Sequence, residues 1–248
     1  KTYYDNKMDI GIEGAGASKE IRPYFDEPAL GLNCTEIINL EFDSSLMMLR
    51  VNISSDEFEP SIQEAIPDVG DINSKHVERN VFDELCGSYL NEWDPEEFEQ
   101  LLHSVGDFGA EFYFRLMGST AEDEKYFFYR HRKLSDPFDS GVILYRNAFS
   151  ISSFEGSRDW IGFGRRARRS PASPTNQTGS WRVRENQIAG LVRIDKQDNP
   201  YLQDLANRQG MEENVQYKLF LDIIDLGLKS FEEYRQSILR LVGRYRKE

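Results

Sequence analysis

The sequence predicts an α+β protein in which a sheet carries helices on one face and a long helix closes the chain. Several short runs rich in aromatic and β-branched residues lie between residues 109 and 154, as expected of strands. A further strand-like run spans Asn186 to Ile194. From residue 211 to 246, apolar side chains recur at three- and four-residue steps, the spacing of an amphipathic helix. Strands followed by helices are typical of this fold class.

Composition narrows the possible functions. The 248 residues are 39% hydrophobic, enough for one fair-sized core or two smaller ones. A net charge of -13 argues against non-specific nucleic-acid binding by the whole molecule, although a local basic patch is compatible with it. The two cysteines, Cys34 and Cys86, match neither a disulfide scaffold nor a metal site, which favours a cytoplasmic protein. No apolar run is long enough to span a bilayer, so we expect no membrane partner.

Residues 1–106 are predicted to form a lead segment and residues 107–248 a second domain. The glycine-rich run at 11–19, GIEGAGASK, is interpreted as a flexible loop, because no buried strand precedes it to make a phosphate-binding turn. Two apolar runs within 36–53 are joined by a polar turn and predict a β-hairpin.

Two amphipathic helices are expected next, at 76–90 and 95–105. Asp94 is a suitable cap for the second, and acidic Glu96 and Glu97 suit its positive end.

The strands of the second domain are predicted at 111–117, 125–131, 141–147 and 149–154. Aromatic residues alternate along the first two, which indicates a core rather than a surface on which bases stack.

One region of the acidic chain is basic. Between residues 158 and 193 there are eight arginines, no lysine and two acids. Residues 158–184, with short polar residues and prolines, are predicted to form a long mobile loop. Its cluster Arg165, Arg166, Arg168 and Arg169 is a candidate nucleic-acid contact, because guanidinium groups bind phosphate through paired hydrogen bonds. The alternative is a loop that pairs with acidic groups of its own molecule.

The stretch from residue 186 to 211 leads from a strand into the long helix. Asn199 and Pro200 predict a turn, with Asn199 capping a helical turn that Pro200 opens. Arg208 follows on a short polar segment before the helix, a position suited to presenting a charge to a phosphate. Its alternative role is an exposed pair with Asp204 or Glu212. The second half of the helix is expected either to cover the core or to meet a partner helix.

Five ordered segments carry a family resemblance: GVILYRNAFSI, DWIGF, NQIAGLVRI, NP and ANRQGM. Together they resemble the second domain of GHKL ATPases, which include gyrase B, MutL, the large heat-shock chaperone and the MORC proteins. The similarity is greatest to prokaryotic histidine-kinase-like or heat-shock-chaperone-like ATP-binding proteins. It covers residues 107–225.

The resemblance implies a transducer domain with a ribosomal-protein-S-five domain-2-like fold and a left-handed crossover. It implies that Arg208 is the catalytic arginine that contacts the γ-phosphate, and that Asn186, Gln187 and Asn207 belong to the same nucleotide-contacting set. The chain departs from the family pattern at Gln209, where glutamate is usual, and at 184–185, where the family has Gly-Asn.

The nucleotide-binding motifs of these ATPases, a Glu–Asn helix and a DxGxG loop, are missing from the sequence. The chain is therefore predicted to be part of a longer protein and not catalytic alone. ATP with Mg is expected to be bound by an upstream ATPase domain in cis, within a homodimer, and no cofactor is expected for this chain by itself. The alternative function is a nucleic-acid-binding module that uses the arginine-rich loop.

Overall fold

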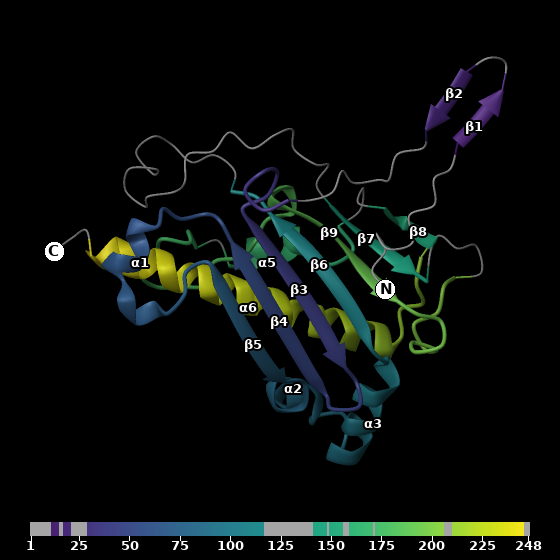
Figure 1. Ribbon diagram of the computed structural model, residues 1–248. Helices are drawn as coiled ribbons and strands as arrows, with labels where there is room; N and C mark the ends of the chain where they lie inside the picture. The colour runs from purple at the N-terminus through teal and green to yellow at the C-terminus, as the bar shows by residue number, and fades with distance from the viewer. Residues whose placement is uncertain are drawn as a thin grey trace.

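A seven-stranded mixed sheet forms the centre of the protein (Figure 1). The computed structural model describes residues 11–14, 17–20, 29–116, 141–147, 149–155, 159–170, 172–205 and 210–245. The strand order is β5-β4-β3-β6-β9-β7-β8, and every neighbouring pair is antiparallel except β7 and β9, which are parallel. The strands are β3 (Glu36–Asp43), β4 (Met48–Ser55), β5 (Ser74–Asn80), β6 (Phe108–Phe114), β7 (Gly141–Arg146), β8 (Phe149–Glu155) and β9 (Ile188–Ile194). The predicted α+β class is confirmed. The strand predicted at 125–131 lies outside the described residues.

The sheet joins the two segments that the sequence predicts as separate. β3 pairs with β6 at seven consecutive positions, from Glu36 opposite Phe114 to Phe42 opposite Phe108. The predicted boundary at residue 106 therefore falls between strands of one sheet, and the strands on either side of it cover the same helix. Cross-strand pairing, which the local sequence does not show, unites the two segments.

The glycine-rich run at the beginning of the chain differs from its prediction. β1 (Gly11–Gly14) and β2 (Ala17–Glu20) form a two-stranded antiparallel sheet in place of a loop. Gly14 pairs with Ala17, so only two residues join the strands, the commonest connection length in hairpins.

The predicted hairpin at 36–53 is confirmed as β3 and β4, whereas the predicted helix at 76–90 is partly wrong. Residues 74–80 form β5, which pairs with β4 at the edge of the sheet. α2 (Val81–Tyr89) begins only after Asn80, whose side-chain oxygen accepts from the Asp83 backbone N–H at 3.2 Å. Pairing with β4 outweighs the amphipathic pattern of these residues.

α3 (Pro95–Val105) begins and ends at the predicted residues. Asp94 accepts from the Glu97 backbone N–H at 2.9 Å, and the Glu97 carboxylate accepts from the Asp94 N–H at 3.1 Å. This reciprocal capping box depends on residues close in sequence, so the sequence predicts it well. The other short helices are α1 (Ser61–Ala65), η2 (Pro67–Val69), α5 (Phe163–Arg169) and η3 (Glu185–Gln187).

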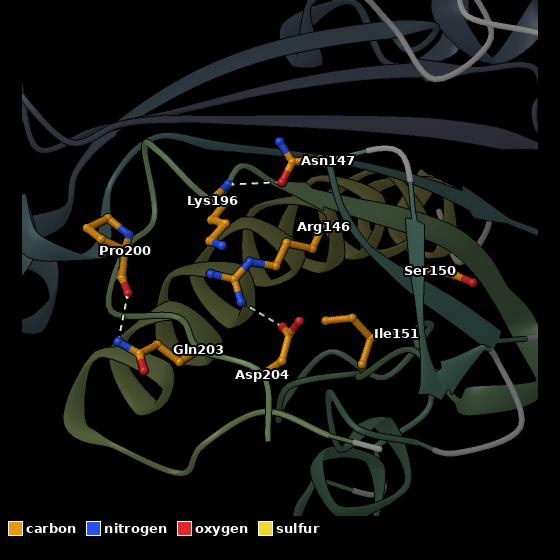
Figure 2. Close-up of a pocket in the computed structure, with 8 residues that line it drawn as sticks. All are labelled: Arg146, Asn147, Ser150, Ile151, Lys196, Pro200, Gln203 and Asp204. Carbon is orange, nitrogen blue, oxygen red and sulfur yellow. Dashed lines mark hydrogen bonds and ion pairs between the residues drawn. The ribbon is translucent and has the colours of Figure 1, made fainter. Parts of the chain in front are cut away.

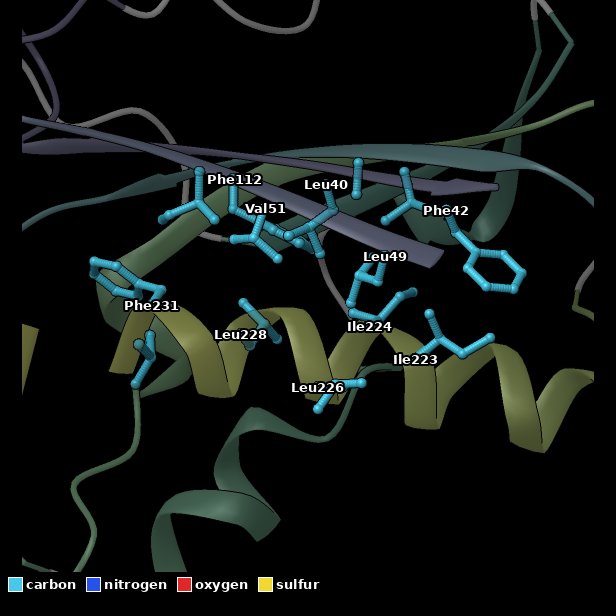
Figure 3. Close-up of a cluster of buried hydrophobic side chains, with 14 of the residues drawn as sticks. Leu40, Phe42, Leu49, Val51, Phe112, Ile223, Ile224, Leu226, Leu228 and Phe231 are labelled. Atoms are coloured by element: carbon cyan, nitrogen blue, oxygen red, sulfur yellow. The ribbon is translucent and has the colours of Figure 1, made fainter. Parts of the chain in front are cut away.

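The long helix α6 (Val215–Tyr245) lies across one face of the sheet (Figures 1 and 3). Alternate residues of the strands point toward it, including Leu40, Leu49 and Phe112, all at most 1% exposed. Gly227 of α6 faces Leu40 so closely that a Cβ atom there would lie 2.5 Å from Leu40 Cδ1. Glycine therefore sets the distance between helix and sheet at this point. A second, smaller cluster occupies the opposite face: Ile143, Tyr145, Ala189 and Leu191.

α6 is buried more widely than the single predicted stripe. Between residues 230 and 239 only Glu233 and Ser237 are exposed. The second half of the helix contacts the segment 176–183 of its own chain, where Arg240 Nε donates to the Asn176 carbonyl at 2.8 Å and Arg244 Nε donates to Gln177 Oε1 at 2.9 Å. Of the two alternatives for the second half of the helix, contact with the core of its own chain or with a partner helix, the structure shows the first for most of these residues.

A buried ion pair fastens the middle of α6 to the segment that follows β4. Arg235 is 1% exposed, and its Nε donates to Glu57 Oε2 at 2.8 Å. The guanidinium carbon lies 5.0 Å from the ring centre of Phe114 and 4.7 Å from that of Trp181. Glu36 is buried beside the pair, and burial, reinforced by the charge of Glu57, raises its pKa well above the usual value.

None of the helices in the described part of the chain combines the length and apolar composition that a bilayer crossing requires.

Candidate functional site

The carboxyl ends of the two parallel strands meet at an open pocket. β7 and β9 pair from Gly141 opposite Ala189 to Arg146 opposite Ile194, so both strands end at the same edge. The pocket there has a volume of about 830 Å³ (Figure 2). Its walls are formed by Arg146, Asn147, Ser150, Ile151, Lys196, Pro200, Gln203 and Asp204. In α/β sheets, ligands commonly bind beyond the carboxyl ends of parallel strands, and this volume is in the range of small-molecule sites.

Arg146, the last residue of β7, contributes the least exposed charge. Its side chain is 13% exposed, and its Nη1 lies 2.7 Å from Asp204 Oδ1. Its Nε atom is buried and has no hydrogen-bond partner among the residues that the structure describes. A guanidinium has five N–H donors, and a carboxylate contacted through one nitrogen leaves several of them free. An unpaired buried donor is uncommon in folded proteins and indicates a position where an acceptor can bind.

Lys196 adds a second cation. Its side chain is exposed, and in Figure 2 its ammonium group points toward the guanidinium of Arg146. The lining residues thus include two cations and one carboxylate, a local balance of +1 in a chain of net charge -13. Because Asp204 already pairs with Arg146, the ligand that suits the pocket is an anion.

Asn147 connects the two strand ends at the rim of the pocket. It has a left-handed backbone, with φ of 55°, which asparagine adopts more readily than most residues. Its backbone N–H donates to the Ile194 carbonyl at 2.9 Å, its Oδ1 accepts from the Lys196 N–H at 3.2 Å, and its Nδ2 donates to the Asp195 carboxylate. The turn after β7 therefore fixes the backbone of Lys196.

Asn199 anchors the other wall. It is fully buried, and its Nδ2 donates to the carbonyls of Val105 and Asp107 at 2.8 and 2.9 Å. Gly106 between them has φ of 77°, and a Cβ there would lie 1.8 Å from the Asp198 carbonyl oxygen. The prediction that Asn199 caps a helical turn is wrong. Its side chain instead joins the loop after β9 to the turn between α3 and β6.

The predicted catalytic residue follows this wall directly, but Asn207 and Arg208 lie outside the described residues. The residues on either side of their segment are held together. The Leu205 N–H donates to the Gly210 carbonyl at 2.9 Å, and the Glu212 N–H donates to the Gln203 carbonyl at 2.9 Å. Leu205 and Gly210, the residues that flank 206–209, are therefore adjacent to each other and lie close to Asp204 in the chain.

Asn186 and Gln187, the other two predicted nucleotide contacts, lie at the opposite end of β9 from the pocket. Asn186 and Gln187 precede β9, whereas Lys196 follows it. At about 3.3 Å per residue, the strand separates them from the pocket by roughly 20 Å. Asn186 is exposed, and Gln187 Oε1 accepts from the Arg184 N–H at 3.2 Å. The structure does not bring these two residues to the pocket, because they occupy the opposite end of the same strand.

The predicted basic loop contains a helix. α5 carries all four candidate arginines, and the residues after it are anchored by Trp181 and Val183, both at most 5% exposed. Arg166 is turned inward and donates through two nitrogens to Glu232 of α6 at 3.0 and 3.1 Å. It also donates to Asp225. Pairing with acidic groups of the same molecule, the alternative left open by the sequence, thus holds for Arg166.

Sequence reasoning missed Arg146 and Lys196. Arg146 ends β7 and Lys196 follows β9, and both strands were correctly predicted. A cation at the end of a predicted strand is therefore the feature of the sequence that could have indicated these two residues. Their convergence depends on the parallel pairing of β7 with β9, which are more than 40 residues apart in sequence. Among the described residues, no group of three or more histidine, cysteine, aspartate or glutamate side chains is arranged to hold a metal ion.

The chain matches no protein-family model, no curated protein and no solved structure. The fold and the pocket define it as a mixed α+β protein with a cationic crevice at the ends of its two parallel strands.

Proposed function

We propose that this chain is the transducer portion of a GHKL-type ATP-binding protein, in which Arg208 contacts the γ-phosphate of ATP bound by an upstream domain in cis. The observation that carries the proposal is the pocket itself. Arg146 and Lys196 face it, Arg146 has an unpaired buried N–H, and the wall formed by residues 199–205 leads directly into Asn207 and Arg208.

The cations at this pocket suit the phosphate end of a nucleotide. Arg208, Arg146 and Lys196 would supply positive charge and N–H donors to phosphate oxygens, which stabilises negative charge that develops during hydrolysis. Asp204, the one carboxylate among the described residues that line the pocket, is paired with Arg146. Magnesium is therefore expected to be held by the upstream domain together with the rest of the nucleotide.

In this proposal, the long helix α6 transmits the effect of phosphate contact to the rest of the protein. α6 begins four residues after Met211 and then crosses the sheet, where it is buried on nearly all sides. A shift of the segment 206–209 on contact with phosphate would be passed to this helix through its first turns. Coupling of ATP binding and hydrolysis to the arrangement of a cytoplasmic homodimer follows from the same proposal.

The decisive experiment measures steady-state ATP hydrolysis and ATP affinity in the chain joined to its upstream sequence. Arg208→Ala should lower turnover by about 10³-fold while changing affinity much less, since arginines that contact a transferred phosphate act mainly in the transition state. Arg208→Lys should restore only part of the rate, because lysine lacks the planar fork.

Lys196→Ala provides a second test, and Lys75→Ala is its matched control, an exposed lysine on β5 away from the pocket. Turnover should fall for Lys196→Ala and remain at the wild-type value for Lys75→Ala. Equal turnover of wild type and Arg208→Ala, with unchanged melting temperatures, would overturn the proposal.

A further inference from the structure

α5 presents three arginines to solvent on one side. Arg165, Arg168 and Arg169 are exposed and occupy positions i, i+3 and i+4, which share a helix face. In the described part of the chain, no carboxylate forms an ion pair with any of the three. We call these three residues the α5 arginine face.

The orientation of this face is fixed from the opposite side of the helix. Arg166 is held by Glu232 and Asp225 of α6, and Phe163 is 3% exposed. At the beginning of the helix, both carboxylate oxygens of Asp159 accept backbone N–H groups, from residues 162, 163 and 164 at 2.8 to 2.9 Å. A short helix anchored at its first turn and on its inner side presents its outer arginines in a defined arrangement.

The charge around the α5 arginine face is positive over a long stretch. Residues 160–184 contain six arginines and no aspartate or glutamate. The two acids at the borders are Asp159, whose oxygens cap the helix, and Glu185, whose Oε2 lies near Gly164 beside Arg168. Arg166 and Arg182 of this stretch are paired with Glu232 of α6, so the positive charge offered to a polyanion is carried mainly by the α5 arginine face.

We infer that the α5 arginine face binds the phosphate backbone of a nucleic acid without reading its sequence. All the cations are arginines, whose fork-shaped donors match phosphate oxygens in pairs. The Cβ atom of Arg165 is about 5 to 6 Å from those of Arg168 and Arg169, so the three guanidinium groups can contact neighbouring phosphates of one backbone. The inference requires no nucleotide at the pocket and stands independently of the ATPase proposal.

The test is fluorescence anisotropy with labelled single-stranded and duplex DNA of about 20 nucleotides, using the whole chain. Three phosphate contacts predict that affinity falls about 40-fold for the duplex and about 20-fold for the single strand when salt rises from about 50 to about 200 mM. Arg165→Ser, Arg168→Ser and Arg169→Ser combined should abolish most binding and flatten the salt slope by up to about three units. Arg166 is left unchanged in this variant because it is part of the anchor.

The control variant combines Arg50→Ser, Lys75→Ser and Lys229→Ser, which removes the same charge from solvent-accessible positions on other elements. It should bind DNA as the wild type does. Loss of binding in the control as well, or no binding by the wild type at low salt, would overturn the inference. So would equal competition by polyglutamate at matched charge, because it would show a surface that accepts any polyanion, including an acidic protein segment.

Discussion

Glu232 of α6 accepts two hydrogen bonds from Arg166 of α5, at 3.0 and 3.1 Å, and so joins the basic region to the central helix. The same carboxylate accepts from Arg182 at 2.9 Å and from the Val183 N–H at 2.9 Å. Glu232 is 1% exposed, and burial raises its pKa while the guanidinium of Arg166 opposes the increase. One buried carboxylate thus organises two arginines and a backbone segment.

Replacing Glu232 with alanine should destabilise the protein by about 2 to 4 kcal/mol, because two partly buried guanidinium groups and one buried N–H lose their acceptor. Urea denaturation measures the free energy of unfolding of each variant. An unchanged m-value shows that the difference is a change in stability. Glu233→Ala is the matched control: its side chain is 49% exposed and its ion pairs lie at the surface, so the cost should stay under about 1 kcal/mol. Similar losses in the two variants would contradict the proposed role of Glu232.

The buried carboxyl of Glu36 should make stability depend on pH. Its pKa in the folded protein is raised, first by burial and then by Glu57, above the ordinary value of 4.5, although Arg235 opposes the shift. The folded state therefore holds more protons than the unfolded state above pH 4.5, and stability falls as pH rises through this window.

Glu36→Gln removes this dependence and keeps one acceptor oxygen, while its NH2 group can donate to the second of the two hydroxyls, those of Thr35 and Ser55, that contact Glu36 in the native protein. Relative to the wild type, the variant should gain stability as pH increases, with a slope of up to about 1.4 kcal/mol per pH unit. Denaturation curves recorded at intervals from about pH 4 to 8 provide the measurement. Two stability profiles that run parallel over this range would show that Glu36 does not titrate in the folded protein.

Gly227→Ala should destabilise the protein even though alanine is the better helix former. The gain in helix propensity is about 1 kcal/mol, but the new methyl group would meet Leu40, which is 1% exposed and cannot move into solvent. Overpacking of this kind costs about 1 to 3 kcal/mol, so we expect a net loss of about 1 kcal/mol.

Gly87→Ala in α2 is the corresponding control. A Cβ at Gly87 has no heavy atom within 4 Å, so the substitution should stabilise the protein by about 0.5 kcal/mol. Thermal denaturation compares the melting temperatures of Gly227→Ala and Gly87→Ala with that of the wild type. A higher melting temperature for Gly227→Ala would show that the sheet and α6 can move apart at no cost.

Some elements were predictable because their causes are local. The Asp94 and Glu97 capping box sets the beginning of α3 within four residues, and the polar turn after residue 43 joins two strands of matching pattern. The apolar period of α6 likewise predicts a long helix, but it does not predict that Gly227 lies against Leu40. In the structure, a Cβ atom at Gly227 would lie 2.5 Å from Leu40 Cδ1, so the helix and the sheet approach each other closely at this residue.

The candidate site was predicted in part. The sequence directs attention to the stretch after β9, and one wall of the pocket is formed there by Pro200, Gln203 and Asp204. It also groups Asn186 with Arg208, although the length of β9 separates Asn186 from this wall. The four arginines of α5 look equivalent in sequence, yet Arg166 faces Glu232 and the others face solvent.

By itself, the sequence determined the fold class, the position of most strands of the large sheet and of the helices α3 and α6, and the presence of a basic region in an acidic chain. These properties follow from periodicity, turn residues and charge, which act over a few residues. Only the tertiary structure decided that β5 is a strand, that Arg146 and Lys196 share a pocket, and that Arg166 is an internal anchor. Each of these depends on contact between segments far apart in the chain, because pairing with β4, the parallel alignment of β7 with β9, and burial against α6 outweigh the local preferences of the residues involved.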